Sequence, residues 1–421
     1  MFALHGHIIY SESKDKLCIK ENGYVICKDG ISQGVYDTLP EQYKNITVKD
    51  YGDRLIIPGL VDLHVHAPQY SFRGLGMDME LLDWLNQYTF PEEAKYKELT
   101  YAEKAYKQFV EELRHSPTTR ACIFATLHTE ATYLLMDLLE EMGMKAYVGK
   151  VNMDRNCPDY LREDDVSEAI RETKEWVGNS IKKYKNVLPI ITPRFIPSCS
   201  DLLMKGLSQL QKETGLPAQS HLSENPSEIK WVQELCPDST CYGDAYDRRG
   251  LFGLYGKTVM AHCVYSTEEE IEKMKENGVY VAHCPQSNTN LSSGIAPAKK
   301  YLERDLKIGL GTDLAGGHSI SMFRAMADAI QVSKLRWRLL NTKETPLTIE
   351  EAFFMGTKGG GEFFGKVGSF EKGYEFDAVV LDDTSLLHPQ ELTVRSRLER
   401  MIYLSDDRNI YAKYIAGCCI V

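Results

Sequence analysis

The sequence predicts an α/β protein: a TIM-type (β/α)8 barrel with a small β-sandwich domain built from both chain ends. Two patterns lead to this prediction. Between residues 58 and 370, short apolar segments alternate with longer segments of helical periodicity, the order that a barrel of parallel strands requires. Residues 1–57 and 371–421 are instead typical of short strands separated by turns. Neither end can bury much surface alone, so we expect the two ends to fold together.

The strands expected at the two ends are bounded by Gly, Asn, Asp and Pro, which favour turns. They are Ala3–Tyr10, Tyr24–Cys27, Ile31–Tyr36 and Arg54–Ile57 before the barrel, and Asp377–Leu381, Met401–Tyr403 and Tyr411–Ala416 after it.

The barrel region begins at Leu60. Its predicted strands are Leu60–His66, Arg120–Thr126, Lys145–Val151, Leu188–Arg194, Ala218–His221, Thr258–His262, Val279–His283 and Lys307–Gly311. Its predicted helices are Glu130–Glu141, Val166–Tyr184, Asp201–Thr214, Ser227–Glu234, Thr267–Glu276 and Ala298–Leu302. An open doubly wound sheet is the alternative, but no G-x-G-x-x-G motif follows a strand, so nothing supports a dinucleotide fold.

Two further segments fall outside the alternation of barrel strands and helices. The aromatic-rich insert of residues 71–95 follows the first barrel strand, and it is either a lid over a pocket or a packing helix. After the eighth strand, helical patterns cover Ile320–Leu339 and Thr348–Phe364. The run Gly359-Gly360-Gly361 predicts a bend or an early stop in the second of them.

The composition narrows the class of protein. Of 421 residues, 43% are hydrophobic, and Lys+Arg 49 against Asp+Glu 60 gives a net charge of −11. An acidic chain without a basic stripe argues against nucleic acid or an anionic membrane as partner. No apolar run is long enough to span a membrane, and the start lacks the pattern of a signal peptide. The 11 cysteines form no C-x-x-C pair, which favours reduced thiols and a cytoplasmic protein.

Two histidines end the first predicted barrel strand. Residues two apart on a strand point the same way, so His64 and His66 project together and can share a metal ion. A lone H-x-H is more often a pair of histidines facing water. The chain repeats the spacing in His5 and His7, so further ligands from other strand ends are needed to support a metal site.

Such ligands are present at three other strand ends. His221 ends the fifth strand, His262 the sixth, and Asp313 follows the eighth. In barrels of this type the carboxyl ends of the strands converge on the active site. Each residue alone could be a helix cap or a satisfied core histidine, but their joint placement predicts a catalytic metal site with room for a water.

A metal would lower the pKa of its water to about 7 and so supply a hydroxide nucleophile. Asp313 is placed to orient that water and to take its proton. Glu224 lies three residues after His221 and could act as proton shuttle, although acidic residues are also common at helix starts. The fourth strand ends Thr192-Pro193-Arg194-Phe195 without the lysine that bridges two metals in some barrels, so one metal is expected.

A series of motifs carries a resemblance to a known family. In chain order they are PGLVDLHVHAPQYSFRG, LLDWLNQYTFPEE, TPRF, QSHLSEN, VMAHC, VAHCPQSN and GLGTDLAGG. The set resembles the amidohydrolase superfamily and, more narrowly, the guanine deaminase family. The resemblance runs from Pro58 to the helix after Asp313 and is weaker at both ends.

The resemblance implies a role for each matching residue. It implies one Zn2+ per subunit held by His64, His66, His221 and Asp313, and a purine contacted by Gln69, Arg194, Phe195, Glu224 and His262. The implied catalytic residues are Glu224, His262 and Asp313. The implied reaction is hydrolytic deamination of guanine to xanthine and ammonia in purine catabolism, with hydroxide attack at C2. Members of the family are usually homodimers.

Several alternatives stay open at this level. A sibling amidohydrolase acting on another amino-heterocycle would share the ligands and differ at Gln69, Arg194 and Phe195. A non-catalytic barrel predicts eroded ligands, and a simple metal-binding protein leaves Glu224 unexplained. Three histidines and an aspartate could also hold iron.

Overall fold

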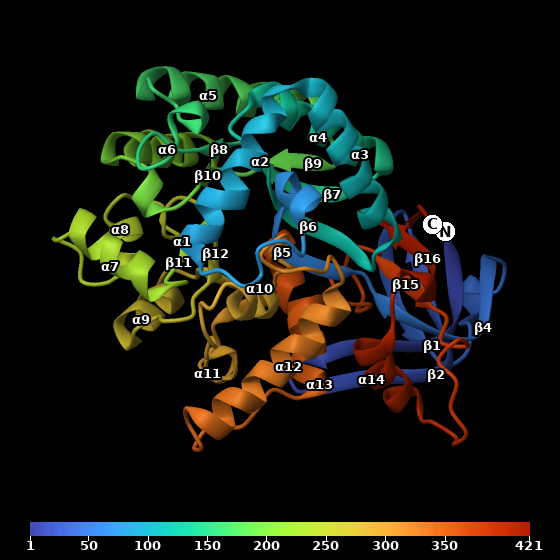
Figure 1. Cartoon of the computed structure of the whole chain (residues 1–421). Helices are drawn as coiled ribbons and strands as arrows, with labels where there is room; N and C mark the ends of the chain where they lie inside the picture. Colours follow the sequence, from blue (N-terminus) through green and yellow to red (C-terminus); the bar gives the residue numbers. More distant parts are fainter.

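A ring of parallel strands forms the centre of the molecule in the computed structural model, which describes residues 1–421 (Figure 1). The strands pair in two sheets of the orders β5-β6-β7-β9 and β11-β12-β13-β14. Their bounds are β5 Leu60–His66, β6 Thr118–Phe124, β7 Lys145–Gly149, β9 Val187–Pro189, β11 Ala218–Leu222, β12 Thr258–His262, β13 Tyr280–His283 and β14 Lys307–Leu310. Each lies where the sequence predicts a strand. A short pair, β8 Val151–Asn152 and β10 Thr192–Pro193, extends the rim.

Backbone hydrogen bonds between the two sheets close the ring. On one side Gln219 N donates to Ile191 O at 2.9 Å, and on the other Asp313 N donates to His64 O at 2.8 Å. The first and eighth strands therefore end side by side, which confirms the barrel and excludes the open sheet.

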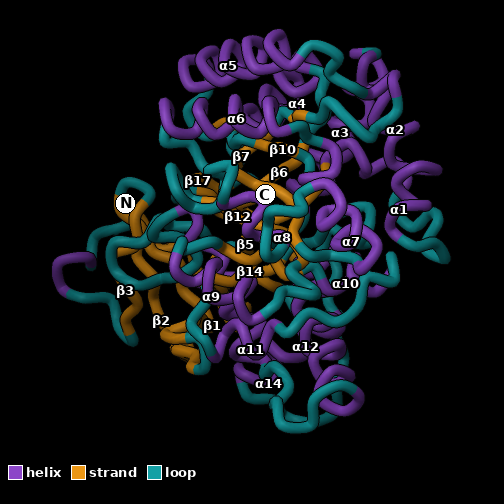
Figure 2. Tube along the Cα trace, turned by 90° about the vertical axis from the view of Figure 1, so that its left-hand side faces the viewer, coloured by secondary structure: helices purple, strands orange, loops and turns teal.

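Helices surround the barrel, as the tube view shows (Figure 2). They are α3 Leu99–His115, α4 Thr129–Met142, α5 Val166–Lys183, α6 Asp201–Thr214, α7 Pro226–Leu235, α8 Tyr242–Asp247, α9 Glu268–Glu276, α10 Pro285–Asn290, α11 Ala298–Glu303, α12 Met322–Leu339 and α13 Ile349–Phe354. The amphipathic helix α3 was not among the predicted helices. None of the helices combines the length and the apolar character needed to cross a membrane.

The predicted bend at the glycine run has a physical reason. After α13 the helix widens into a π turn over Met355–Gly359 and then tightens into a 3-10 turn over Glu362–Phe364. A Cβ atom on Gly309 of β14 would lie 2.7 Å from the Cα atom of Gly360. Glycine on both sides therefore lets this segment approach the barrel strand closely.

Strands from both chain ends share one seven-stranded sheet of order β17-β16-β15-β4-β1-β2-β3 (Figure 1). Its members are β1 Phe2–Ser13, β2 Lys16–Lys28, β3 Ile31–Tyr36, β4 Thr47–Pro58, β15 Ala378–Leu381, β16 Ile410–Ile415 and β17 Cys418–Cys419. The link is antiparallel pairing of β4 with β15, with Pro58 opposite Ala378. The two ends thus fold together as expected, while the arrangement as a sandwich of two layers stays a prediction.

One predicted strand near the C-terminus is wrong. Residues 401–403 lie within helix α14, Val394–Leu404. Thr393 caps this helix by accepting a hydrogen bond from Ser396 N, and its buried residues Val394, Leu398, Met401 and Ile402 follow helical spacing. The short apolar run Met401–Tyr403 is only the last turn of that buried stripe, and a run this short does not distinguish strand from helix.

Candidate active site

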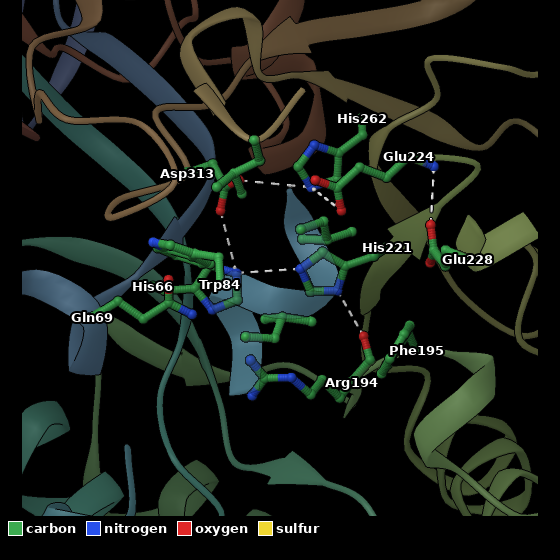
Figure 3. Close-up of a pocket in the computed structure, with 13 residues that line it drawn as sticks. His66, Gln69, Trp84, Arg194, Phe195, His221, Glu224, Glu228, His262 and Asp313 are labelled. Atoms are coloured by element: carbon green, nitrogen blue, oxygen red, sulfur yellow. Dashed lines mark hydrogen bonds and ion pairs between the residues drawn. The ribbon is translucent and has the colours of Figure 1, made fainter. Parts of the chain in front are cut away.

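Five polar side chains meet at the carboxyl-terminal end of the barrel. His66, His221, His262 and Asp313 are labelled in Figure 3. His64 and His66 come from the end of β5, His221 from β11 and His262 from β12, and Asp313 follows β14. Parallel strands bring their ends to one rim, so residues far apart in sequence become neighbours.

The ligand atoms of the four predicted metal-binding residues lie close together. His66 Nε2 is 3.2 Å from His64 Nε2 and 3.2 Å from His221 Nε2. Asp313 Oδ1 is 3.2 Å from His64 Nε2 and 3.4 Å from His66 Nε2. Two overlapping groups have the spacing of a metal site: His64 with His66 and Asp313, and His64 with His221 and His262.

The protonation of these groups fits a cation. His221 Nδ1 donates to Arg194 O at 2.7 Å, which leaves the lone pair of Nε2 facing the cluster. Burial, together with the neighbouring His64, holds the pKa of His66 and of His221 well below the usual value, so both rings are neutral. Burial alone would raise the pKa of Asp313, but the adjacent histidines, His64 first, hold that pKa well below its usual value. Neutral imidazoles and a carboxylate are ligands that zinc accepts.

A buried carboxylate behind the cluster joins the ends of β5 and β14. Asp62 accepts hydrogen bonds from Thr312 Oγ1 at 2.5 Å, from Thr312 N at 3.0 Å and from His64 N at 3.1 Å. Burial raises the pKa of Asp62 to about 6, against the effect of these hydrogen bonds. The contacts hold the backbone of His64 beside the residue that precedes Asp313, so they set the spacing of two predicted ligands.

Glu224 and His262 form a second pair at the edge of the cluster. His262 Nε2 lies 3.4 Å from Glu224 Oε2 and 3.7 Å from Asp313 Oδ2, while His262 Nδ1 is held by Asn288 Oδ1 at 2.8 Å. Burial, and then the charge of Asp313, raises the pKa of Glu224 well above its usual value. A protonated carboxyl beside a histidine can donate and accept protons in turn.

The loops that carry these residues are strained. Ser223, His262, Cys263 and Asp313 have φ values of 48°, 75°, 49° and 47°. This left-handed region is unfavourable for residues other than glycine and is typical of functional sites. The strain occurs where the chain turns sharply off a strand to present a side chain to the pocket.

Gln69 and Arg194 form another wall of the same pocket. Arg194 makes two bonds with the carboxylate of Glu93, from Nη1 at 2.6 Å and from Nη2 at 3.2 Å. Gln69 Nε2 donates to the same carboxylate at 3.1 Å, and Gln69 Oε1 accepts from Ala315 N at 3.2 Å. The wall therefore consists of side chains with fixed orientations.

The space inside the pocket and at its solvent opening amounts to about 420 Å³. It is lined by His66, Gln69, Leu81, Trp84, Leu85, Arg194, Phe195, His221, Glu224, Glu228, His262, Leu291 and Asp313 (Figure 3). The insert contributes the short helices α1 Leu81–Trp84 and α2 Phe90–Ala94. Its Leu81 and Trp84 are buried against Leu291 from the other side of the opening. The insert therefore lines the pocket, which fits both expected roles of this segment, a lid and a packing helix.

The structure brings every predicted site residue to the lining of this pocket except His64, whose Nε2 atom is 3.2 Å from that of His66. His283, also at a strand end, is buried without a hydrogen-bond partner, and burial lowers its pKa to about 4.

Sequence reasoning missed Glu93 and Glu228. Glu228 closes a capping box on α7 and lies beside Glu224, whose backbone N–H it accepts at 3.2 Å. The pattern Asn225-Pro226-Ser227-Glu228 carried that signal. Glu93 lies in the short helix α2, and no local sequence pattern shows that this helix points Glu93 toward the pocket.

Comparison with known proteins places this architecture in a family. The model of the amidohydrolase family matches residues 55–419. The chain is 38% identical to guanine deaminase of Dictyostelium discoideum, over 98% of this chain and 96% of that protein. It is 41% identical to guanine deaminase of Mus musculus, over 87% and 82% respectively. A crystal structure of guanine deaminase from C. acetobutylicum with bound guanine superposes with a TM-score of 0.97 at 48% identity, covering 100% of this chain and 99% of that one. The chain therefore belongs to the amidohydrolase family and, within it, to the family of guanine deaminases.

Proposed function

We propose that this protein hydrolyses guanine to xanthine and ammonia, as an enzyme of purine catabolism. The observation that carries the proposal is that one pocket joins two sets of residues. One set is the cluster of metal-ligand atoms with Glu224 and His262 at its edge. The other is the wall of Gln69, Arg194 and Phe195. The relatives named guanine deaminase support the same substrate.

We assign His64, His66, His221 and Asp313 as ligands of one zinc ion per subunit, with iron as the alternative that this donor set also accepts. When bound, the metal supplies a Lewis acid that activates water for attack at neutral pH. His262 is left out of the ligand set because its Nε2 atom also faces Glu224, which suits a hydrogen bond to the attacking oxygen.

The orientation of guanine follows from its hydrogen-bonding groups. Its acceptors are O6, N7 and N3, and N3 is adjacent to the reacting carbon C2. With C2 toward the cluster and N3 toward Glu224, O6 and N7 remain for Arg194, which has only donors. Phe195 lines the pocket and offers an aromatic face for the flat ring.

The reaction moves both protons of the attacking water, and the residues present can carry them. The water oxygen bonds to C2, and its two protons end on N3 and on the leaving amino group. Asp313 accepts the first proton from the water. Glu224, whose pKa burial raises well above its usual value, donates its proton to N3 and recovers one from the oxygen now bonded to C2. The proton held by Asp313 passes to the amino group, which leaves as ammonia.

Three further assignments belong to this proposal. We propose the division into a barrel of residues 58–370 and a β-sandwich domain of residues 1–57 and 371–421. The resemblance favours a homodimer, and the scattered reduced cysteines favour a cytoplasmic location. Light scattering of the purified protein tests the dimer, and a monomeric mass would contradict this assignment.

Ammonia release from guanine tests the reaction. We expect release with xanthine as product, loss of activity after chelation, and recovery with added zinc. The variant Glu224→Gln should keep its zinc and lose about 10²–10⁴-fold in kcat, because it removes the proton shuttle. A metal-loaded protein that leaves guanine intact would instead indicate another amino-heterocycle, such as an adenosine-type or triazine substrate. A protein that binds no metal would contradict the ligand assignment.

A further inference from the structure

A buried carboxylate without a part in the proton transfers connects the two polar side chains of the recognition wall. Glu93 is 1% exposed and contacts Arg194 through both of its oxygens. Its Oε1 atom also accepts from Gln69 Nε2. One side chain of the insert therefore holds both residues that face the substrate.

The contacts determine which way each partner presents its hydrogen-bonding groups. A carboxylate only accepts, so the amide of Gln69 must turn its NH2 group toward Glu93. Its carbonyl then points to Ala315 N and is occupied there at 3.2 Å. What Gln69 has left for a ligand is its second N–H, a donor.

Arg194 is fixed in the same way. Two parallel bonds to one carboxylate define the plane of the guanidinium group. The ring of Phe90, one helical turn before Glu93 on α2, lies 5.1 Å from the guanidinium carbon. Both the edge and the face of Arg194 are thus held by α2, and its unused N–H groups are also donors.

We propose that Glu93 is a positioning residue that sets the hydrogen-bond polarity of the pocket and thereby selects purines with an oxo group at C6 over those with an amino group. This inference rests on the proposed function, because it requires guanine to be bound with the edge that carries O6 facing Gln69 and Arg194. The oxygen of a 6-oxo group accepts hydrogen bonds and would meet only the N–H donors of Gln69 and Arg194. A 6-amino group is itself a donor and would face those donors without an acceptor.

A second buried ion pair shows how a purely structural pair differs. Lys150 and Glu163 are joined at 2.5 Å, and the other partners of Glu163 are Asn152 and the backbone of Met153. None of these lines the pocket. Both side-chain partners of Glu93 do, so loss of Glu93 should alter ligand preference as well as stability.

The test uses the metal-loaded full chain and two ligands that lack the amino group at C2 and so cannot undergo the reaction. Hypoxanthine carries the 6-oxo group, and adenine carries a 6-amino group in its place. Equilibrium Kd values of both are measured for the wild type, Glu93→Gln and the control Glu92→Gln. Glu92 is buried on the same helix, but its partners Lys95 and Tyr101 lie outside the pocket.

We expect Glu93→Gln to reduce the preference for hypoxanthine over adenine by at least about tenfold, because the new amide lets Gln69 present its carbonyl. Its kcat/KM for guanine should fall about 100-fold, as expected for misplaced substrate contacts. Glu92→Gln should keep both values within about twofold. Because Glu93 acts through Gln69 as well as through Arg194, combining Glu93→Gln with Arg194→Met should cost less than the sum of the two single losses.

Equal weakening of both ligands in Glu93→Gln would overturn the inference, as would additive losses in the double variant. If Glu93→Gln does not fold, Glu93→Asp replaces it. That variant keeps an acceptor-only group and should retain the preference at weaker affinity, and loss of the preference there would also count against the inference. Failure of the wild type to release ammonia from guanine would reject the proposed reaction, while the ratio of the two Kd values tests Glu93 independently.

Discussion

The chain contains two H-x-H pairs with identical spacing on strands, and the structure gives them different surroundings. On β1, each histidine contacts its own aspartate near the surface, with His5 Nδ1 2.8 Å from Asp50 and His7 Nε2 2.9 Å from Asp53. On β5, His64 and His66 turn their Nε2 atoms toward each other and toward His221 and Asp313.

The difference lies in what the neighbouring strands bring. One neighbour of β1 is β4, which contains both Asp50 and Asp53 and so supplies separate, exposed partners. The rim beside β5 is closed by β14, and the barrel adds ligands from distant parts of the sequence. An H-x-H pair therefore joins a cluster of possible metal-ligand atoms through closure of the barrel and not through its own spacing.

Removing one histidine from each pair tests this comparison with the largest expected effect. We expect His66→Ala to lose its zinc and at least about 10⁴-fold in kcat, because a Lewis acid lowers the pKa of water from 15.7 to about 7. His7→Ala should keep zinc and activity unchanged. Metal content by mass spectrometry and ammonia release from guanine measure both variants.

Equal loss of zinc in the two variants would show that the pairs are equivalent, contrary to the comparison. A His66→Ala protein with full zinc and no activity would move the metal to the overlapping group of His64, His221 and His262.

The convergence of the candidate metal ligands was predictable from the sequence, and the reason is local. Strand ends are recognisable from short apolar runs, and the parallel strands of a barrel all end at one rim. His221 and Asp313 could therefore be placed together from the sequence alone. The partners of His5 and His7 were not predictable in the same way, because sheet register depends on pairing between distant strands.

The residues proposed to contact the purine were predictable only in part. Gln69 and Arg194 were identified by resemblance, but Glu93 was missed because its role depends on how the insert folds back over the barrel. The insert contains short helices with no strong periodicity, and tertiary contacts decide their direction. Helix α14 has a different reason: its cap and its helical stripe are local signals, and they outweigh the short apolar run Met401–Tyr403.

A smaller perturbation of barrel closure sharpens the comparison. Thr312→Val removes the hydroxyl that donates to the buried carboxylate of Asp62, which should cost about 1–3 kcal/mol in the free energy of unfolding. Because Asp62 also holds the backbone of His64, zinc affinity should fall about tenfold or more. Urea denaturation and competition with a chelator measure the two effects.

Thr312→Ser is the matched control, since it keeps the hydroxyl and should retain most of the zinc affinity. A Thr312→Val protein that binds zinc as tightly as the wild type would show that the ligands do not depend on the contact between the first and eighth strands.

The smallest expected effect concerns the surface pair on β1. A hydrogen bond from His5, and then one from Gly52 N, lowers the pKa of Asp50. A carboxyl group whose pKa is lower in the folded state adds stability above its unfolded pKa of about 3.9, and this stability is lost as the pH falls below that value. His5→Ala should therefore shift the melting temperature by less than about 2 °C at pH 7, and the difference from the wild type should shrink further near pH 3. Thermal unfolding at the two pH values measures it. A shift that grows on acidification would contradict a contribution from the hydrogen bond to Asp50 alone and would show that His5 stabilises β1 through another contact.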